Sequence, residues 1–249
     1  MEKLIDIKNL YKTYHTKKCE IDALNNINFS INKGDFIGIV GPSGCGKSTL
    51  LSLIGNLEEP TKGNIEKNGT IKIGYMLQDD CLFPWLTIYE NCLLGLKIEK
   101  NLTEENIENV KNLLKTYGLF DFINNYPRDL SGGMRQRVAL IRTLAIKPDV
   151  LLLDEPFSAL DYQTRLSVSN DVLNIIKNEG KTLIIVTHDI SEAISMCNKV
   201  VVLTNRPSTV KKIYSIDYIK EYKDPIKNRS SKEFMEYYKQ IWDDLNYEK

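Results

Sequence analysis

Cysteine clusters, long apolar runs and an excess charge of one sign are all missing from this chain of 249 residues. Its five cysteines are scattered without a Cys-x-x-Cys pair, which is typical of free thiols in a reducing cytosol. The longest apolar runs, at 150–153 and 183–186, are far shorter than the roughly 20 residues that span a bilayer, and no basic-then-apolar leader is present. We therefore expect a soluble protein that reaches a membrane only through another protein.

The charges balance, because Lys plus Arg and Asp plus Glu both number 33. No net basic field draws the chain to nucleic acid, so we expect no nucleic-acid partner, and recognition should rely on shape and apolar contact. Repeats and low-complexity linkers are absent as well. The length predicts one large domain or two small ones, which bury roughly 70 to 75% of the unfolded surface.

The most informative segment that is present is a glycine-rich run that fits G-x-x-x-x-G-K-[ST]: Gly41, Pro42, Ser43, Gly44, Cys45, Gly46, Lys47, Ser48 and Thr49. In this pattern the glycines let backbone N–H groups surround phosphates, the lysine reaches the β and γ oxygens, and the hydroxyl binds Mg²⁺. Residues 36–40 precede it as a buried strand, and residues 48–56 follow as a helix whose N-terminus faces the anion. We call residues 41–49 the phosphate loop.

The hydrophobic pattern changes along the chain. Residues 4–40 contain runs that alternate with period 2 and predict strands, whereas residues 88–147 show helical spacing, with Thr103 and Ser131 as predicted caps. Strand signals return at 150–154, 182–187 and 199–204. A nucleotide-binding core interrupted by a helical insertion is the simplest interpretation.

Four apolar runs end in polar residues that suit nucleotide chemistry. One enters the phosphate loop, and the others end at Gln78, at Asp154-Glu155 and at His188. Because ligands bind beyond the carboxyl ends of parallel strands, we expect these groups to converge on one crevice. Asp154 is interpreted as a Mg²⁺ partner rather than a helix cap, and Glu155 as the group that polarises water rather than a solvated acid. Gln78 is a predicted Mg²⁺ or water contact, and His188 a catalytic residue rather than an ordinary strand-end histidine.

Two further motifs are Leu130 to Gln136 and Ser158-Ala159-Leu160-Asp161. With the phosphate loop, Gln78, Asp154-Glu155 and His188, they make the chain resemble the ATP-binding subunit of ABC transporters. The resemblance extends from about residue 4 to residue 207. The resemblance implies an α/β fold, a P-loop NTPase with a RecA-like core, an N-terminal antiparallel β subdomain and an inserted α-helical signature subdomain. Within a single domain of 1–249, it implies a nucleotide-binding core with the β subdomain at 1–87 and 148–207, a helical subdomain at 88–147, and a C-terminal extension at 208–249. In that extension Ser230 with Glu233 predicts a capping box for an amphipathic helix.

The resemblance also implies a head-to-tail dimer of two copies of the chain, with ATP and Mg²⁺ as cofactors. Ser131, Gly132 and Gly133 of one copy then complete the γ-phosphate site formed by the phosphate loop of the other, since a capped helix start offers N–H donors. Gln136 and Asp161 are implied nucleotide contacts. The implied metal ligands are Ser48, Gln78 and Asp154, and the implied catalytic residues are Glu155, His188 and Gln78.

An aromatic platform for adenine usually lies upstream of the phosphate loop in this family. Tyr14, 27 positions before Gly41, is the predicted stacking residue, and Tyr11 is the alternative. Stacking of a base on an aromatic ring is worth about 1 to 3 kcal/mol and tolerates the choice of base. We therefore expect modest discrimination between nucleotides.

A narrower resemblance, to the nitrate, sulfonate and taurine importers, is carried by Leu82 to Thr87, by Glu90-Asn91 and by Asn205-Arg206-Pro207. Leu77, where an aromatic is common, and Cys197-Asn198, where Ala-Asp is common, depart from the pattern and leave the solute open. Pro84-Trp85 stands where the family docks its membrane permease; the alternative is a turn whose tryptophan is tucked into the core.

The resemblance implies the ATP-hydrolysing subunit of an importer. It would lie on the cytoplasmic face of the cell membrane, bound to a permease that a solute-binding protein supplies with a small anionic solute. The alternative from another class is a soluble ABC mechanoenzyme of DNA repair or translation. Such chains usually carry a coiled-coil insertion, tandem cassettes or a basic surface, which this sequence lacks. An exporter half would need a fused membrane segment.

Overall fold

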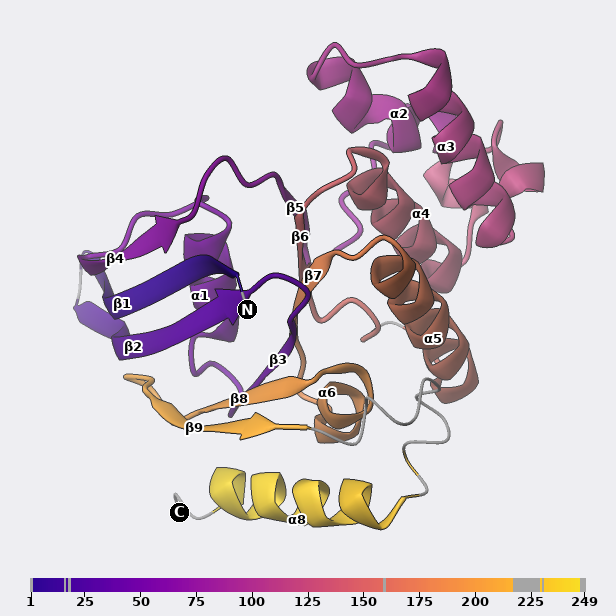
Figure 1. Cartoon of the computed structure of the whole chain (residues 1–249). Coiled ribbons are helices and arrows are strands. Elements are labelled where there is room, and N and C mark those ends of the chain that lie inside the picture. The colour runs from indigo at the N-terminus through magenta and orange to yellow at the C-terminus, as the bar shows by residue number, and fades with distance from the viewer. Residues whose placement is uncertain are drawn as a thin grey trace.

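The computed structural model describes residues 2–15, 17, 19–158, 160–216, 229 and 231–246. Its centre is a six-stranded sheet in the order β5-β6-β7-β3-β8-β9 (Figure 1). Five strands are parallel, and β9 pairs antiparallel with β8. The strands are β5 (Ile73–Met76), β6 (Val150–Asp154), β7 (Thr182–Val186), β3 (Phe36–Val40), β8 (Lys199–Leu203) and β9 (Val210–Ser215). Every residue of β3, β6 and β7 is buried, which explains their continuous apolar runs.

A second, antiparallel sheet is formed by β1 (Lys3–His15), β2 (Glu20–Asn32) and β4 (Lys62–Lys67) in the order β2-β1-β4. The apolar residues of β1 and β2 share one core with helix α1 (Lys47–Ile54) and with one face of the central sheet. Helix α1 begins one residue before the predicted helix and ends before Gly55. The antiparallel sheet is thereby fixed beside the phosphate loop.

Residues 88–145 form helices that pack together, at the upper right of Figure 1. They are α2 (Ile88–Ile98), α3 (Glu104–Thr116), the 3₁₀ turns η1 (Phe120–Phe122) and η2 (Pro127–Asp129), and α4 (Gly132–Ala145). The hydroxyls of Thr103 and Ser131 accept hydrogen bonds from Asn106 N and Met134 N, so both predicted caps are present. Buried side chains join this layer to the other face of the central sheet.

The remaining helices are α5 (Tyr162–Asn178), α6 (Ile190–Met196) and α8 (Lys232–Asn246). Phe234 and Ile241 of α8 are buried in a core shared with α6 and β8. The predicted cap Ser230 lies outside the described residues, while the Ser231 hydroxyl accepts a hydrogen bond from Phe234 N. No helix in the described part of the chain combines the length and apolarity needed to cross a bilayer.

Candidate functional site

The phosphate loop turns tightly between β3 and α1. Gly44 and Gly46 have φ angles of 71° and 110°, in the left-handed region that favours glycine. A Cβ at Gly41 would lie only 2.8 Å from the sulfur of Cys45, so a side chain there would push the loop open. The loop leads directly into α1, whose first-turn N–H groups have no partners within the helix and suit a bound anion.

Lys47 lies across this loop. Its Nζ donates hydrogen bonds of 2.9 Å to the carbonyl oxygens of both Gly41 and Pro42. The side chain is buried, so the ammonium is held in the turn rather than extended into solvent. A positive charge in this place can bind phosphate oxygens as a point charge.

Ser48 and Asp154 bring two oxygens together from α1 and from the end of β6. The Ser48 hydroxyl donates a hydrogen bond of 3.1 Å to Asp154 Oδ1. Asp154 is only 4% exposed, and burial raises the pKa of its carboxyl group. A divalent cation would compensate such a buried carboxylate, and hydroxyl and carboxylate oxygens are ligands that suit Mg²⁺. Within the described residues no group of three or more His, Cys, Asp or Glu is arranged to hold a metal ion.

Glu155 and His188 meet where β6 and β7 end. The distance between Glu155 Oε2 and His188 Nδ1 is 3.2 Å. Glu155 has a φ of 44°, a conformation that costs about 1 to 3 kcal/mol for a residue with a side chain, and its N–H donates to Val186 O. The neighbouring strand thus holds a strained backbone that points the carboxylate toward the histidine.

These groups share one hollow, which we call the site hollow. It is lined by Ser43, Gly44, Gly46, Lys47, Ser48, Thr49, Gln78 and Glu155. The structure therefore brings together the ends of β3, β5 and β6, and His188 joins them through its contact with Glu155. Parallel strands make this possible, because their carboxyl ends lie at one edge of the sheet.

Gln136, an implied nucleotide contact, is buried within this chain. Its side chain is only 6% exposed, and its Nε2 donates a hydrogen bond of 3.2 Å to the carbonyl oxygen of Gln78 in the same chain. The contact joins α4 to the segment 78–87, which we call the linking loop. Helical spacing alone could not have shown this contact, because it joins residues 58 positions apart.

Arginines of α4 hold the first part of the linking loop. Arg135 Nε donates to the Asp80 carboxylate at 2.8 Å, and the guanidinium of Arg142 donates to the carbonyls of Asp80 and Cys81 at 2.7 Å each. Bonds to a charged donor are stronger than neutral ones. This end of the loop is therefore fixed to α4.

Asn91 of α2 holds the second part. It is fully buried, accepts a hydrogen bond from Phe83 N, and donates to the carbonyls of Phe83, Leu86 and Thr87. Its amide is the partner of Phe83 N and Leu86 O, and it adds to the bonds that Phe83 O and Thr87 O accept from Leu86 N and Asn91 N. Sequence reasoning noted Asn91 only as part of a motif.

Two aromatic rings project from the linking loop. Trp85 is 68% exposed and Phe83 38%, with ring centroids 5.1 Å apart. The alternative that Trp85 is tucked into the core is therefore wrong. The bonds to Asn91 present this aromatic pair on the surface.

The signature residues lie on a separate surface. Ser131 is exposed at the start of α4, and a Cβ at Gly133 would lie 2.9 Å from the end of the Leu160 side chain, which would have to shift to admit it. Among the described residues that line the site hollow, none belongs to 130–136. Asp161 caps α5 by accepting from Gln163 N and Thr164 N, while the neighbouring Ala159 is outside the described residues.

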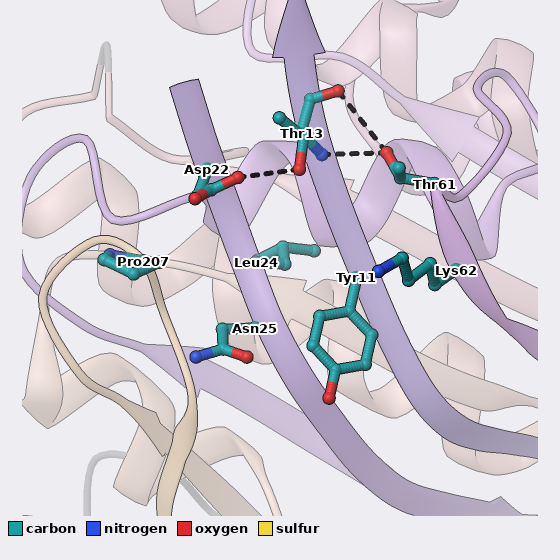
Figure 2. A pocket seen from close by; sticks show the side chains of 8 residues that line it. All are labelled: Tyr11, Thr13, Asp22, Leu24, Asn25, Thr61, Lys62 and Pro207. Atoms are coloured by element: carbon teal, nitrogen blue, oxygen red, sulfur yellow. Dashed lines mark hydrogen bonds between the residues drawn. The ribbon is translucent and has the colours of Figure 1, made fainter. Parts of the chain in front are cut away.

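The two candidate tyrosines lie in different surroundings. The Tyr14 hydroxyl is 3.2 Å from the Thr49 hydroxyl of the phosphate loop. Tyr11 instead lines a second hollow with Thr13, Asp22 and Pro207, as Figure 2 shows. Of the two, Tyr14 is the one that the structure connects to the phosphate loop.

Comparison with known proteins gives a consistent result. The ABC transporter family model matches residues 24–158. The chain is 46% identical to the uncharacterized ABC transporter ATP-binding protein YtlC of Bacillus subtilis, over 97% of this chain and 95% of that protein. It is 38% identical to the nitrate import ATP-binding protein NrtD of Synechocystis, over 95% and 93%. It is 37% identical to the aliphatic sulfonates import ATP-binding protein SsuB of Bacillus cereus, over 98% and 96%.

A solved structure shows the same architecture. It is a dimeric post-hydrolysis state of the ATP-binding cassette MJ0796 bound to ADP and phosphate, with a TM-score of 0.78 and 34% identity. The match covers 86% of this chain and 99% of that one. The expected α/β fold with an antiparallel β subdomain and a mostly parallel sheet is therefore confirmed.

Proposed function

The chain belongs to the ABC transporter family of ATPases, and from this premise we propose that it is the ATP-hydrolysing subunit of an importer for a small anionic solute. The observation that carries the chemistry is the 3.2 Å contact between Glu155 and His188 at the edge of the site hollow. It places a carboxylate and an imidazole beside the phosphate loop. In that loop Lys47 supplies an ammonium, and Ser48 donates a hydrogen bond to the buried Asp154 at the end of β6.

ATP binds with its phosphates on the phosphate loop. Lys47 exchanges its bonds to Gly41 O and Pro42 O for bonds to β and γ oxygens, and the N-terminus of α1 adds its dipole. Ser43, Gly44, Cys45, Gly46 and Thr49 contribute backbone donors or hydroxyls around the same groups. Tyr14 stacks on the adenine.

Ser48 and Asp154 would hold Mg²⁺, and Gln78, which lines the same hollow as Ser48, would be a further contact. When bound, the metal neutralises charge on the phosphate oxygens. Asp154 would act as a carboxylate ligand, and the Ser48 hydroxyl, which donates to it in this structure, would supply the second oxygen.

Glu155 then orients the attacking water. Its carboxylate accepts a hydrogen bond from the water and increases the nucleophilicity of the oxygen, in line with the γ phosphorus. His188, which contacts Glu155, fixes the orientation of the carboxylate and can donate to the charge that develops on the phosphate. The hydrogen bond from Glu155 N to Val186 O keeps the group at this place despite the strained φ.

Two copies form a head-to-tail dimer in which Ser131, Gly132 and Gly133 of one copy close over the phosphate loop of the other. The dimeric neighbour bound to ADP and phosphate supports this arrangement. The exposed cap of α4, separate from the site hollow of its own chain, supports it as well. Asp161, exposed at the start of α5, would lie near the same interface. Gln136, which is buried against Gln78, acts in this proposal by holding the linking loop.

We divide the domain as the sequence indicated, with a core at 1–87 and 148–207, a helical subdomain at 88–147 and an extension at 208–249. The exposed pair of Phe83 and Trp85 docks on the cytoplasmic part of a membrane permease. Truncation of a buried interface tryptophan commonly costs 2 kcal/mol or more, about thirtyfold in affinity. The chain is thereby held at the cytoplasmic face of the cell membrane.

The relatives named for nitrate and aliphatic sulfonate import support an anionic solute, delivered by a solute-binding protein. To test this, the gene is deleted and uptake of nitrate, an aliphatic sulfonate and taurine is measured. Loss of uptake of one of them, restored by the wild-type gene but not by Lys47→Ala, is expected. Unchanged uptake of all three would contradict the proposed solute class.

A further inference from the structure

Tyr14 is held by three side chains from different parts of the chain. Its hydroxyl is 2.8 Å from Glu58 Oε2 and 3.2 Å from Thr49 Oγ1. The ammonium of Lys12 lies 4.9 Å from the centroid of the Tyr14 ring and 2.9 Å from Glu58 Oε2. Neither Lys12 nor Glu58 belongs to a motif that the sequence reveals.

The contacts on the two sides of β1 show how this arrangement is formed. Lys12 and Tyr14 are two residues apart and project from the same face of the strand, toward Glu58, which follows α1. Thr13 projects from the opposite face, where its hydroxyl donates to Asp22 in the hollow of Figure 2. One face of β1 is thus directed to the end of the phosphate-loop helix and the other away from it.

The charges determine the direction of the hydrogen bonds. Burial alone would raise the pKa of Glu58, but the hydrogen bonds from Lys12 and Tyr14 outweigh it and lower that pKa. Glu58 is therefore an ionised acceptor, and the phenol must donate its single proton to it. It follows that the Thr49 hydroxyl donates to the phenol oxygen, so the bonds run from Thr49 through Tyr14 to Glu58.

We propose that Glu58 and Lys12 are positioning residues that fix the Tyr14 ring for stacking on the base of the bound nucleotide, an inference that rests on the proposed function. The phenol is anchored at its hydroxyl, and the Lys12 ammonium interacts with the ring. A ring that is ordered before the nucleotide arrives loses less entropy on binding. The bond to Thr49 also ties the platform to the phosphate loop, so base and phosphates are received at a fixed spacing.

The test compares a ligand with a base and one without. Binding of ATP-Mg²⁺ and of tripolyphosphate-Mg²⁺ to the full chain is measured by titration calorimetry for wild type, Glu58→Ala, Lys12→Met and Tyr14→Phe. Each substitution is expected to weaken ATP binding about threefold to tenfold, the effect of one or two lost bonds. Tripolyphosphate binding is expected to stay unchanged. Asp22→Asn, which alters the exposed carboxylate bonded to Thr13 on the other face, serves as the control and is expected to change neither.

A double-mutant cycle separates positioning from general structural damage. In a Tyr14→Ala background, Glu58→Ala is expected to cause no further loss of ATP affinity, because it acts through the ring. Equal losses for ATP and tripolyphosphate, a Glu58→Ala effect that persists without the ring, or unchanged ATP affinity in Glu58→Ala would each overturn the inference. If the wild-type chain bound neither ligand, the proposed function itself would be wrong.

Discussion

The sheet edge, by which we mean the carboxyl ends of β3, β6 and β7, and the linking loop are held in place by different kinds of hydrogen bonds. At the sheet edge, backbone groups bond to backbone groups: Glu155 N donates to Val186 O, and Thr187 N donates to Ile39 O. In the linking loop, side chains of the helical layer bond to the backbone, with Arg142 and Asn91 supplying most of the contacts. Two parts of one site are thus fixed to two different layers.

Because of this difference, the two regions should respond differently when a partner binds. Groups on the central sheet keep their spacing, because adjacent buried strands share a ladder. The linking loop instead follows α2 and α4, and the exposed Ser131 caps the start of α4. A displacement at Trp85 would therefore reach Gln78 and Ser131 together, while Lys47 and Glu155 stay with the sheet.

The largest effect is expected at the sheet edge, for Glu155→Gln. The amide can still hold a water but supplies no negative charge, so turnover should fall by about 10²- to 10⁴-fold. ATP binding should persist, and size-exclusion chromatography with ATP-Mg²⁺ should show a stabilised dimer. Glu59→Gln, an exposed neighbour of α1, is the matched control. A Glu155→Gln chain that stayed monomeric under these conditions would count heavily against the dimer.

Lys47→Ala should also abolish turnover, but with a different signature. The ammonium neutralises phosphate charge in both ground and transition states, so ATP affinity and hydrolysis should fall together. Calorimetry and steady-state kinetics measured on the same preparation separate this result from that of Glu155→Gln. Normal ATP affinity in Lys47→Ala would place the phosphates elsewhere.

Ser131→Arg tests the signature residues at the start of α4, the helix that holds the linking loop. The bulky side chain should block the partner's γ-phosphate and reduce hydrolysis by at least about 10²- to 10³-fold, as for loss of a well-placed donor. Nucleotide binding by a single chain should be nearly intact, because Ser131 does not line its own site hollow. If Ser131→Arg bound ATP as poorly as Lys47→Ala, the signature residues would belong to the site of their own chain.

Trp85→Ala should act only through the assembled complex. Basal ATPase is expected within a few fold of wild type, whereas solute-stimulated ATPase should be lost, since docking weakens about thirtyfold or more. The thermal midpoint should barely change, because the side chain is largely exposed. Trp242→Ala, which removes an exposed tryptophan of α8, is the control. Full stimulation by solute in Trp85→Ala would remove this loop from the permease interface.

Asn91→Ala should give the smallest change in turnover. The substitution removes the partner of Phe83 N and of Leu86 O, at about 1 to 3 kcal/mol each before relaxation and hydration, whereas Phe83 O and Thr87 O still accept from Leu86 N and Asn91 N. Amide exchange at 83–87 should therefore accelerate, while exchange in β3 and β6 stays slow. Equal acceleration in both regions would show that loop and sheet are one cooperative unit. That result would contradict the claim that they are fixed to different layers.

The difference between the sheet edge and the linking loop also explains which features could be predicted from the sequence. Continuous apolar runs identified β3, β6 and β7, and the polar residues at their ends followed from strand direction alone. The bonds of Arg142, Asn91 and Gln136 to the linking loop were missed, as was the link between Glu58 and Tyr14. These contacts join residues whose partners depend on how helices pack or strands bulge, and no local pattern encodes them. The choice between Tyr14 and Tyr11 was open for the same reason.

The central claim, that each ATP site needs the phosphate loop of one copy and the signature residues of the other, is tested most directly by mixing two inactive variants. Lys47→Ala and Ser131→Arg chains are assayed for ATPase activity separately and after mixing. Random pairing makes about half of the dimers mixed, each with one intact site of two, so about a quarter of the wild-type rate should return if the sites act independently. If instead both residues served the site of their own chain, every site would carry a defect and mixing would restore nothing.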